Sequence, residues 1–212
     1  MAEILDQTVF SDLLEHLSKN KLPVNKYRQK VGVGMSQCFG MVRKRSMAPD
    51  LSRCSWNDAK LHHLLMDFSK HLHINFSFSS IQVNANYSCR PHFDVHNEGN
   101  SYIVGFGDYI GGELVLKTPA GDTSIDIKFK PLLFNGSLIE HYTKEWTGNR
   151  YTLVFHTIVS PPKFPMIRSL SDYTAKSIDN NKWVIECRDG TILSRNNGLP
   201  HPLKGRKKVE LM

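Results

Sequence analysis

His92-Phe93-Asp94 opens a stretch of the chain that closes with Arg150-Tyr151-Thr152-Leu153-Val154-Phe155-His156, and His141 lies between the two ends. Two histidines and one carboxylate can bind a non-haem Fe(II) ion on one side and leave its other coordination positions open. The guanidinium of Arg150 is planar and always charged, so it can hold a carboxylate through two parallel hydrogen bonds. His92, Asp94 and His141 are therefore the predicted metal ligands, and Arg150 is the predicted anchor for a carboxylate.

The closing segment has the alternation of a β-strand that lies against a cavity. Side chains two residues apart in a strand share one face. One face here carries a guanidinium, a hydroxyl and an imidazole, those of Arg150, Thr152 and His156. Because the guanidinium and the hydroxyl point the same way, both can reach one carboxylate group. Thr152 is therefore predicted to assist Arg150, and the apolar opposite face is expected to pack.

A second strand with one polar face is predicted over residues 81–89, just before the H-x-D element. Asn84 and Asn86 share the polar face of this segment, whose other face is apolar. A polar row suits the wall of a polar pocket, so both are candidate ligand-binding residues. Arg90 and Asn97, on either side of the metal-binding element, are candidates for hydrogen bonds to the edge of a substrate. Alternatively, these polar groups stabilise turns at the mouth of a barrel.

Short segments with a period of two continue to about residue 158, and turn residues separate them. The clearest turn signals are Gly107-Asp108, Ala120-Gly121-Asp122, Asn135-Gly136 and Thr147-Gly148-Asn149. Short antiparallel strands of this kind are typical of a barrel or a sandwich. Amphipathic helical patterns precede them at residues 4–20 and 56–73. The predicted fold class is therefore α+β, mainly β, with flanking N-terminal helices.

Residues 21–55 are predicted to contain a basic loop that contacts substrate. They carry eight Lys or Arg residues and a single acid, Asp50. Short strands are expected at 31–34 and 39–42, followed by a long loop from 43 to 55. A basic loop with interleaved aromatics can hold phosphates and stack on a base. The candidate substrate contacts are Arg43, Arg45, Arg53 and Phe39. The alternative is a solvated surface loop.

The length of 212 residues favours one domain, with helices and the basic loop in 1–75, a β core in 76–160 and an extension in 161–212. The extension ends in a basic tail at 204–208. The formal charge is +7 and the pI is about 9.2, which favours a polyanionic partner, with nucleic acid first and an acidic membrane surface second.

The four cysteines are scattered and form no C-x-x-C pair. This spacing argues against a zinc knuckle or a disulfide scaffold and fits reduced thiols. No apolar run approaches the roughly 20 residues that span a bilayer, and the N-terminus has no signal-peptide pattern. An intracellular protein without a membrane partner is therefore expected, nuclear if the source is eukaryotic. A monomer is the favoured oligomeric state.

Residues 31–158 resemble the Fe(II)- and 2-oxoglutarate-dependent dioxygenases with a double-stranded β-helix core. Within that superfamily they are more similar to the TET/JBP-like branch, which oxidises the methyl groups of pyrimidine bases. The segments that carry this resemblance are Phe39-Gly40 with Arg43-Lys44-Arg45, Ser80-Ile81-Gln82-Val83-Asn84, residues 92–101 from His92 to Ser101, and Gly107-Asp108-Tyr109-Ile110-Gly111-Gly112-Glu113-Leu114.

The resemblance implies a jelly-roll, cupin-like core, bound Fe(II), and 2-oxoglutarate and O2 as co-substrates. It implies that Arg150, with Thr152, holds the distal carboxylate of 2-oxoglutarate. The implied substrate is 5-methylcytosine or thymine in DNA, with the base flipped out of the duplex at a cost of about a few kcal/mol. His96, two residues past Asp94, is expected to face substrate or solvent rather than the metal.

Two departures separate the chain from neighbouring families. AlkB-type demethylases carry a second arginine six residues after the co-substrate arginine, where this chain has His156. Collagen-type prolyl hydroxylases commonly use lysine at the position of Arg150. Two alternatives stay open: the same chemistry on RNA or on a protein side chain, and a catalytically silent nucleic-acid-binding module.

Overall fold

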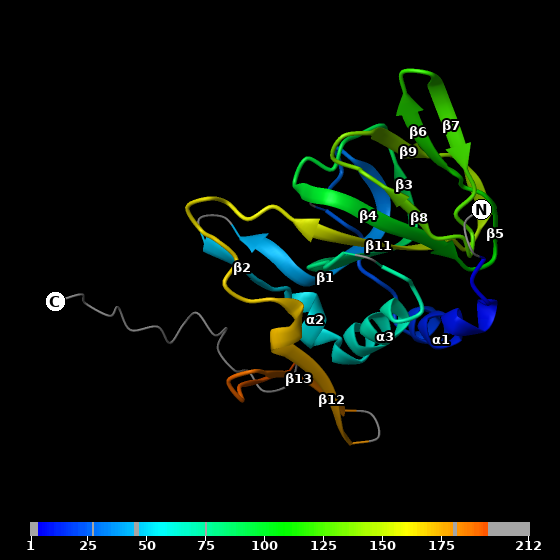
Figure 1. Cartoon of the computed structure of the whole chain (residues 1–212). Helices are drawn as coiled ribbons and strands as arrows, with labels where there is room; N and C mark the ends of the chain where they lie inside the picture. Colours follow the sequence, from blue (N-terminus) through cyan, green and yellow to red (C-terminus); the bar gives the residue numbers. More distant parts are fainter. Residues whose placement is uncertain (1–3, 27, 45–46, 75, 180–181, 195–212) are drawn as a thin grey trace.

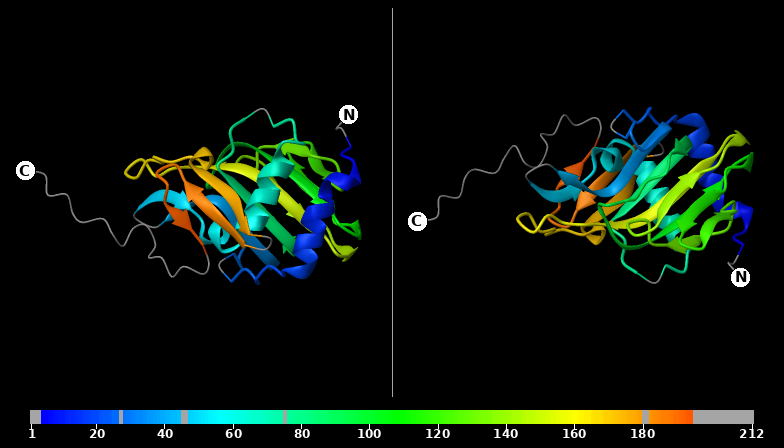
Figure 2. Two further views of the ribbon diagram at one scale, coloured as in Figure 1. Left: turned by 90° about the horizontal axis from the view of Figure 1, so that it is seen from below. Right: turned by 90° about the horizontal axis from the view of Figure 1, so that it is seen from above.

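The structure is a computed structural model of the chain and describes residues 4–26, 28–44, 47–74, 76–179 and 182–194. Two antiparallel sheets face each other, and the helices cover the outer side of the larger sheet (Figure 1). Residues of both sheets line a cavity between them. Figure 2 shows the helices crossing this sheet from below and the strands fanning out from above. The mainly β architecture predicted from the turn spacing is therefore present.

The larger sheet has six strands in the order β2-β1-β3-β11-β4-β8. Its strands are β1 (Gly32–Lys44), β2 (Met47–Leu51), β3 (Ser80–Cys89), β4 (Asn97–Phe106), β8 (Leu132–Phe134) and β11 (Tyr151–Ile158). The central neighbours β3 and β11 pair so that Thr152 lies opposite Asn84 and Val154 lies opposite Gln82. This register places Gln82 and Asn84 of β3 side by side with Thr152 and Val154 of β11 on the face that lines the cavity.

The smaller sheet has the order β7-β6-β9. Its strands are β6 (Leu114–Thr118), β7 (Gly121–Ile125) and β9 (Glu140–Thr143), and a separate pair joins β5 (Tyr109–Gly111) to β10 (Trp146–Gly148). Ile103 and Phe134 of the larger sheet meet Leu114 of the smaller sheet in a buried cluster, which Ile127 completes from the segment after β7. This small core holds the sheets together and leaves the space beside it open.

The N-terminal helices lie on the outer face of the larger sheet (Figure 1). They are η1 (Gln7–Phe10), α1 (Ser11–Lys19), α2 (Arg53–Asn57) and α3 (Ala59–Ser69). Of these, α1 and α3 bury most of the apolar side chains there. Ser52 caps α2 and Asp58 caps α3, each through its side-chain oxygen. Phe10, Leu61 and Phe68 pack with Phe155 and the apolar side chains of β3. The apolar face of β11 is thereby buried, so its polar face points toward the cavity.

The C-terminal part adds a small sheet below the helices. A short 3-10 helix, η2 (Leu170–Asp172), leads into β12 (Tyr173–Asp179), β13 (Lys182–Cys187) and β14 (Ile192–Leu193). The predicted basic tail at 204–208 lies outside the described residues. Among the described residues, no helix has the length and apolar character needed to cross a bilayer.

The region predicted as two short strands and a long loop is different in the structure. β1 is one strand of 13 residues that bends at two glycines with positive φ, Gly34 and Gly40. The segment after it forms β2 and α2. Phe39 pairs with Ile81 and is 0% exposed inside the main core. The prediction that Phe39 stacks on a base is therefore wrong, because its ring faces the helices.

The predicted alternation of β3 also fails at one position. Asn86 has φ +48 and forms a bulge against β1, between the pairs Val33–Ser88 and Met35–Ala85. A bulge adds one residue and exchanges the two faces of the strand beyond it. Tyr87 therefore lines the cavity, although it was expected on the packing face.

Candidate active site

His92 and His141 come from different parts of the chain and meet through their backbones. Each N–H donates to the carbonyl of the other, at 3.1 and 3.0 Å. Asp94 follows in a turn, where its N–H donates to the carbonyl of Gly136 at 2.8 Å. The β9 strand and the segment after β3 are thus locked together at the point where the predicted ligands lie.

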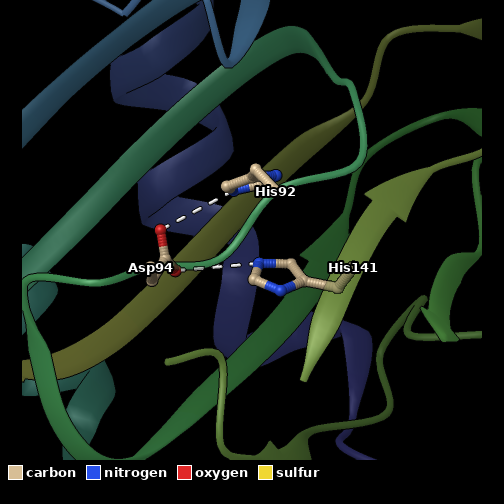
Figure 3. A group of neighbouring side chains, drawn as sticks. All are labelled: His92, Asp94 and His141. Carbon is tan, nitrogen blue, oxygen red and sulfur yellow. Dashed lines mark ion pairs between the residues drawn. The ribbon is translucent and has the colours of Figure 1, made fainter. Parts of the chain in front are cut away.

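The three side chains converge on one point, as Figure 3 shows. Nε2 of His92 lies 3.6 Å from Oδ1 of Asp94, and Nε2 of His141 lies 3.7 Å from its Oδ2. One ligand atom from each residue lies within 4.8 Å of the other two. The side chains of His92, Asp94 and His141 are only 11%, 16% and 6% exposed, so all three are largely shielded from solvent.

Hydrogen bonds select the tautomer of both imidazole rings. Nδ1 of His92 lies 2.8 Å from the carbonyl of Arg90, and Nδ1 of His141 lies 2.9 Å from that of Ile139. A carbonyl oxygen only accepts, so each Nδ1 carries the hydrogen and each Nε2 keeps its lone pair. Burial lowers the pKa of His141, which favours the neutral ring. This is the arrangement of metal-binding histidines held by an outer hydrogen bond.

Arg28 is a member of this group that the sequence patterns did not reveal. One of its terminal nitrogens lies 3.2 Å from Oδ1 of Asp94. Burial raises the pKa of Asp94, but the contact with His92 and the positive charge of Arg28 outweigh it and hold the pKa at about 2. Asp94 is therefore ionised over the whole physiological range.

The three ligand candidates stand at the edge of a cavity of about 540 Å³ between the two sheets. Arg150, Thr152, Val154 and His156 line it from β11, and Gln82 and Asn84 line it from β3. This lining confirms the prediction that one face of the strand carries Arg150, Thr152 and His156. The exposed residues of the lining, Arg43, Phe93, Val95 and His96, mark the mouth of the cavity.

Arg150 is 3% exposed, yet it forms no ion pair with any carboxylate of the described residues. Its Nε donates to the carbonyl of Gly112 at 3.1 Å, and its guanidinium lies between the rings of Tyr109 and Trp146, 5.5 and 5.4 Å from their centroids. Burial lowers the pKa of Arg150. A buried cation without an anion is costly, so the site is complementary to a carboxylate ligand.

Asn84 and Asn86, predicted to act alike, have different roles. Asn84 lines the cavity and donates from Nδ2 to Oγ1 of Thr152 at 3.0 Å. Asn86 instead accepts from the backbone N–H of Arg150 at 2.8 Å and donates to Asn149 at 3.4 Å. It fixes the start of β11 and does not line the cavity. The structure therefore does not place Asn86 at the predicted ligand site; its side chain binds the backbone of Arg150 instead.

The predicted substrate contacts divide into two groups. Arg43, His96 and Asn97 line the cavity mouth, where a terminal nitrogen of Arg43 donates to Nδ1 of His96 at 2.7 Å. Arg53 instead lies over the ring of Trp56, on the helical side of the sheet. Arg90 is exposed and contributes its carbonyl to His92. The remaining candidate, Arg45, lies outside the described residues.

Sequence comparison finds no match, neither to a family model nor to a curated protein. Among solved structures, the chain is similar to NgTET1 in complex with 5mC DNA, with a TM-score of 0.53 and 12% identity over 78% of this chain and 73% of that one.

Two further similar structures match less well. A 2OG-Fe(II) oxygenase family oxidoreductase from Burkholderia pseudomallei gives a TM-score of 0.43 and 15% identity over 68% of this chain and 75% of that one. A prolyl-4-hydroxylase from Pseudomonas putida gives a TM-score of 0.46 and 12% identity over 75% of this chain and 91% of that one. The predicted mainly β, jelly-roll fold is confirmed, and the chain shares the overall fold of NgTET1.

Proposed function

We propose that this protein is an Fe(II)- and 2-oxoglutarate-dependent oxygenase that oxidises the methyl group of a 5-methylpyrimidine base, 5-methylcytosine or thymine, in DNA. One observation carries the proposal. A cavity between two sheets has two histidines and an ionised carboxylate at its edge, and its wall holds a buried arginine that has no anion among the described residues.

The donor set fits Fe(II). Two imidazole nitrogens and one carboxylate oxygen leave coordination positions open for a chelating co-substrate and O2. Space around the ligands is reserved by Gly136, since a Cβ there would lie 3.2 Å from Cε1 of His141 and 3.3 Å from Oδ2 of Asp94. The glycine therefore keeps a side chain at this position from crowding His141 and Asp94.

The wall of the cavity fits 2-oxoglutarate, a ligand with two carboxylates. Arg150 would hold the distal carboxylate, and Thr152, oriented by Asn84, would donate or accept beside it. When bound, the iron and co-substrate supply the oxidant: one oxygen atom of O2 enters the C–H bond of the methyl group, and the other enters succinate as CO2 is released. The protein positions the methyl group and limits the access of water.

The electrostatics and the cavity size support a nucleic acid base as the substrate. The chain has a formal charge of +7, and Arg43 is exposed at the cavity mouth. A cavity of about 540 Å³ suits a single flipped base rather than a duplex. NgTET1, which shares the fold, was solved in complex with 5mC DNA. Together these features favour DNA over a protein side chain.

The test combines succinate formation with mass spectrometry of nucleosides from methylated and unmethylated DNA. We expect succinate and an oxidised base to appear together and to be lost in His92→Ala, with His71→Ala as an exposed-histidine control. Succinate that no DNA stimulates would move the search to RNA or protein. A protein that binds Fe(II) and forms no succinate would be a binding module.

A further inference from the structure

Gln82 and His156 are two polar cavity residues that the proposed roles for iron and 2-oxoglutarate leave unused. Gln82 is 8% exposed and His156 is 7% exposed, and both line the cavity. Val154 pairs with Gln82 across the strands, so His156 is the diagonal neighbour of Gln82 on the same face. Diagonal neighbours lie roughly 7–8 Å apart, within reach of one common group.

Hydrogen bonds determine which atom of Gln82 faces the cavity. Its Nε2 donates to Oγ of Ser36 at 2.5 Å and approaches the carbonyl of Val83 at 3.5 Å. The carbonyl of Val83 can only accept a hydrogen bond, so the Gln82 amide is oriented with its Nε2, and not its oxygen, toward that carbonyl. Both amide hydrogens are thus directed into the protein. The carbonyl oxygen Oε1 has no hydrogen-bond partner among the described residues. It is also not one of their fully buried, unpaired polar atoms, so it remains accessible from the cavity.

His156 presents an acceptor in the same way. Its Nδ1 lies 3.3 Å from the carbonyl of Val154, so Nδ1 carries the hydrogen. Burial lowers the pKa of His156, which keeps the ring neutral and leaves a lone pair on Nε2. Nε2 likewise has no hydrogen-bond partner among the described residues and is not one of their fully buried, unpaired polar atoms. It is therefore also accessible from the cavity. Gln82 and His156 therefore offer two hydrogen-bond acceptors to the cavity, while their own N–H groups point to Ser36, Val83 and Val154.

We propose that Gln82 and His156 form an acceptor pair that binds the exocyclic amino group of the base, so that the substrate is 5-methylcytosine and not thymine. This inference rests on the proposed function. The amino group of cytosine has two N–H donors, whereas thymine has a carbonyl oxygen at the same ring position. Two acceptors attract the first group and repel the second.

The pair also orients the base. The ring carbon that bears the amino group is bonded to the carbon that bears the methyl group. A base held by its amino group therefore keeps its methyl group directly beside the anchored position, in the same cavity as the metal ligands. A site built to bind an N–H discriminates strongly against a base that lacks it, because buried acceptors are left unpaired.

The experiment measures kcat/KM for 5-methylcytosine, thymine and 5-methyl-2-pyrimidinone, which lacks the amino group. Each base is placed at the same position of one oligonucleotide, opposite an abasic site, so that no base pair has to be broken. The wild type should prefer 5-methylcytosine at least about 100-fold over both others. Gln82→Met and His156→Leu should each reduce this preference about tenfold, mainly by lowering the value for 5-methylcytosine.

Gln7→Leu and His71→Leu, at exposed positions away from the cavity, are the matched controls and should keep the full preference. Succinate formed without DNA reports that the metal and co-substrate site of each variant is intact. Equal turnover of thymine, or variants that keep the preference, would overturn the acceptor pair and leave the proposed function standing. Oxidation of none of the bases would overturn both.

Discussion

The guanidinium of Arg28 lies 3.2 Å from the carboxylate oxygen Oδ1 of Asp94, while the other oxygen, Oδ2, faces His141. The two residues are 66 positions apart in the chain. The contact orients the carboxylate and contributes to the low pKa of Asp94, about 2. Arg28 therefore holds one oxygen in place and leaves the other for a metal ion.

Replacing Arg28 should weaken metal binding. An outer hydrogen bond to a metal ligand typically contributes 10- to 100-fold in affinity, so Arg28→Gln should lower the affinity for Fe(II) about tenfold. Titration with Co(II), followed by its absorption spectrum under anaerobic conditions, measures the effect. Lys30→Gln removes an exposed charge nearby and is the control. Unchanged or tighter binding by Arg28→Gln would show that orientation of Asp94 does not limit affinity.

Gly112 should be required for the binding of 2-oxoglutarate. A Cβ at this position would lie 2.8 Å from both Cδ and Nε of Arg150, and the residue has φ +71. Gly112→Ala should therefore displace the guanidinium and weaken 2-oxoglutarate binding more than tenfold, measured by calorimetry. Gly121→Ala is the control, because Gly121 also has positive φ but nothing within 4 Å of the added Cβ. Equal effects of the two variants would point to backbone strain instead of contact with Arg150.

Local periodicity was sufficient to predict the strand that carries Arg150 and Thr152, because alternation depends only on neighbouring residues. It was insufficient at Asn86, where one residue with positive φ exchanges the faces of β3. Asparagine adopts that conformation more readily than most residues, but it does so in only a minority of cases. The sequence therefore gave no firm signal for the bulge.

Long-range contacts account for the other differences. Arg28 lies in a basic segment without periodicity, and only the folded chain brings it to Asp94. Phe39 is the first residue of the short strand predicted over 39–42, which gives it the place of an exposed strand end beside the basic loop. In the structure the strand continues through Gly40 at φ +86, and a Cβ there would lie 2.5 Å from the carbonyl of Ser79. Close packing against β3 thus requires the glycine and buries the aromatic ring.

His62 should make the stability of the protein depend on pH. The ring is 2% exposed, its Nδ1 has no hydrogen-bond partner among the described residues, and burial lowers its pKa from 6.5 to about 4. Between pH 6.5 and 4 the unfolded chain takes up a proton that the folded chain does not. The free energy of unfolding should therefore fall as the pH falls through this window, by about 3 kcal/mol at most.

His62→Leu removes this group and should flatten the pH dependence, so that its advantage in Tm over the wild type grows from pH 7 to pH 4.5. Thermal unfolding followed by circular dichroism across that range measures it. His71→Leu, just past the same helix and exposed, controls for the loss of an imidazole. Parallel pH profiles for the wild type and His62→Leu would contradict the prediction.

Arg43 should contribute one phosphate contact at the cavity mouth. It is exposed, lines the mouth and is held by His96 at 2.7 Å. Each phosphate that a cation neutralises releases counterions, so log K falls with log salt in proportion to the number of contacts. Arg43→Gln should weaken binding to DNA of any sequence and reduce the magnitude of this salt slope by about 1. Fluorescence anisotropy at several salt concentrations measures both quantities.

The control variant is Lys19→Gln, which removes an equally charged side chain from the exposed face of α1, away from the cavity mouth. Both variants change the net charge by the same amount, so a general attraction of the basic chain for DNA falls equally in both. A phosphate contact at the cavity lowers the salt slope only in Arg43→Gln. If Lys19→Gln lowers the slope as much, DNA binds through diffuse charge, and the mouth has no specific role in holding the backbone.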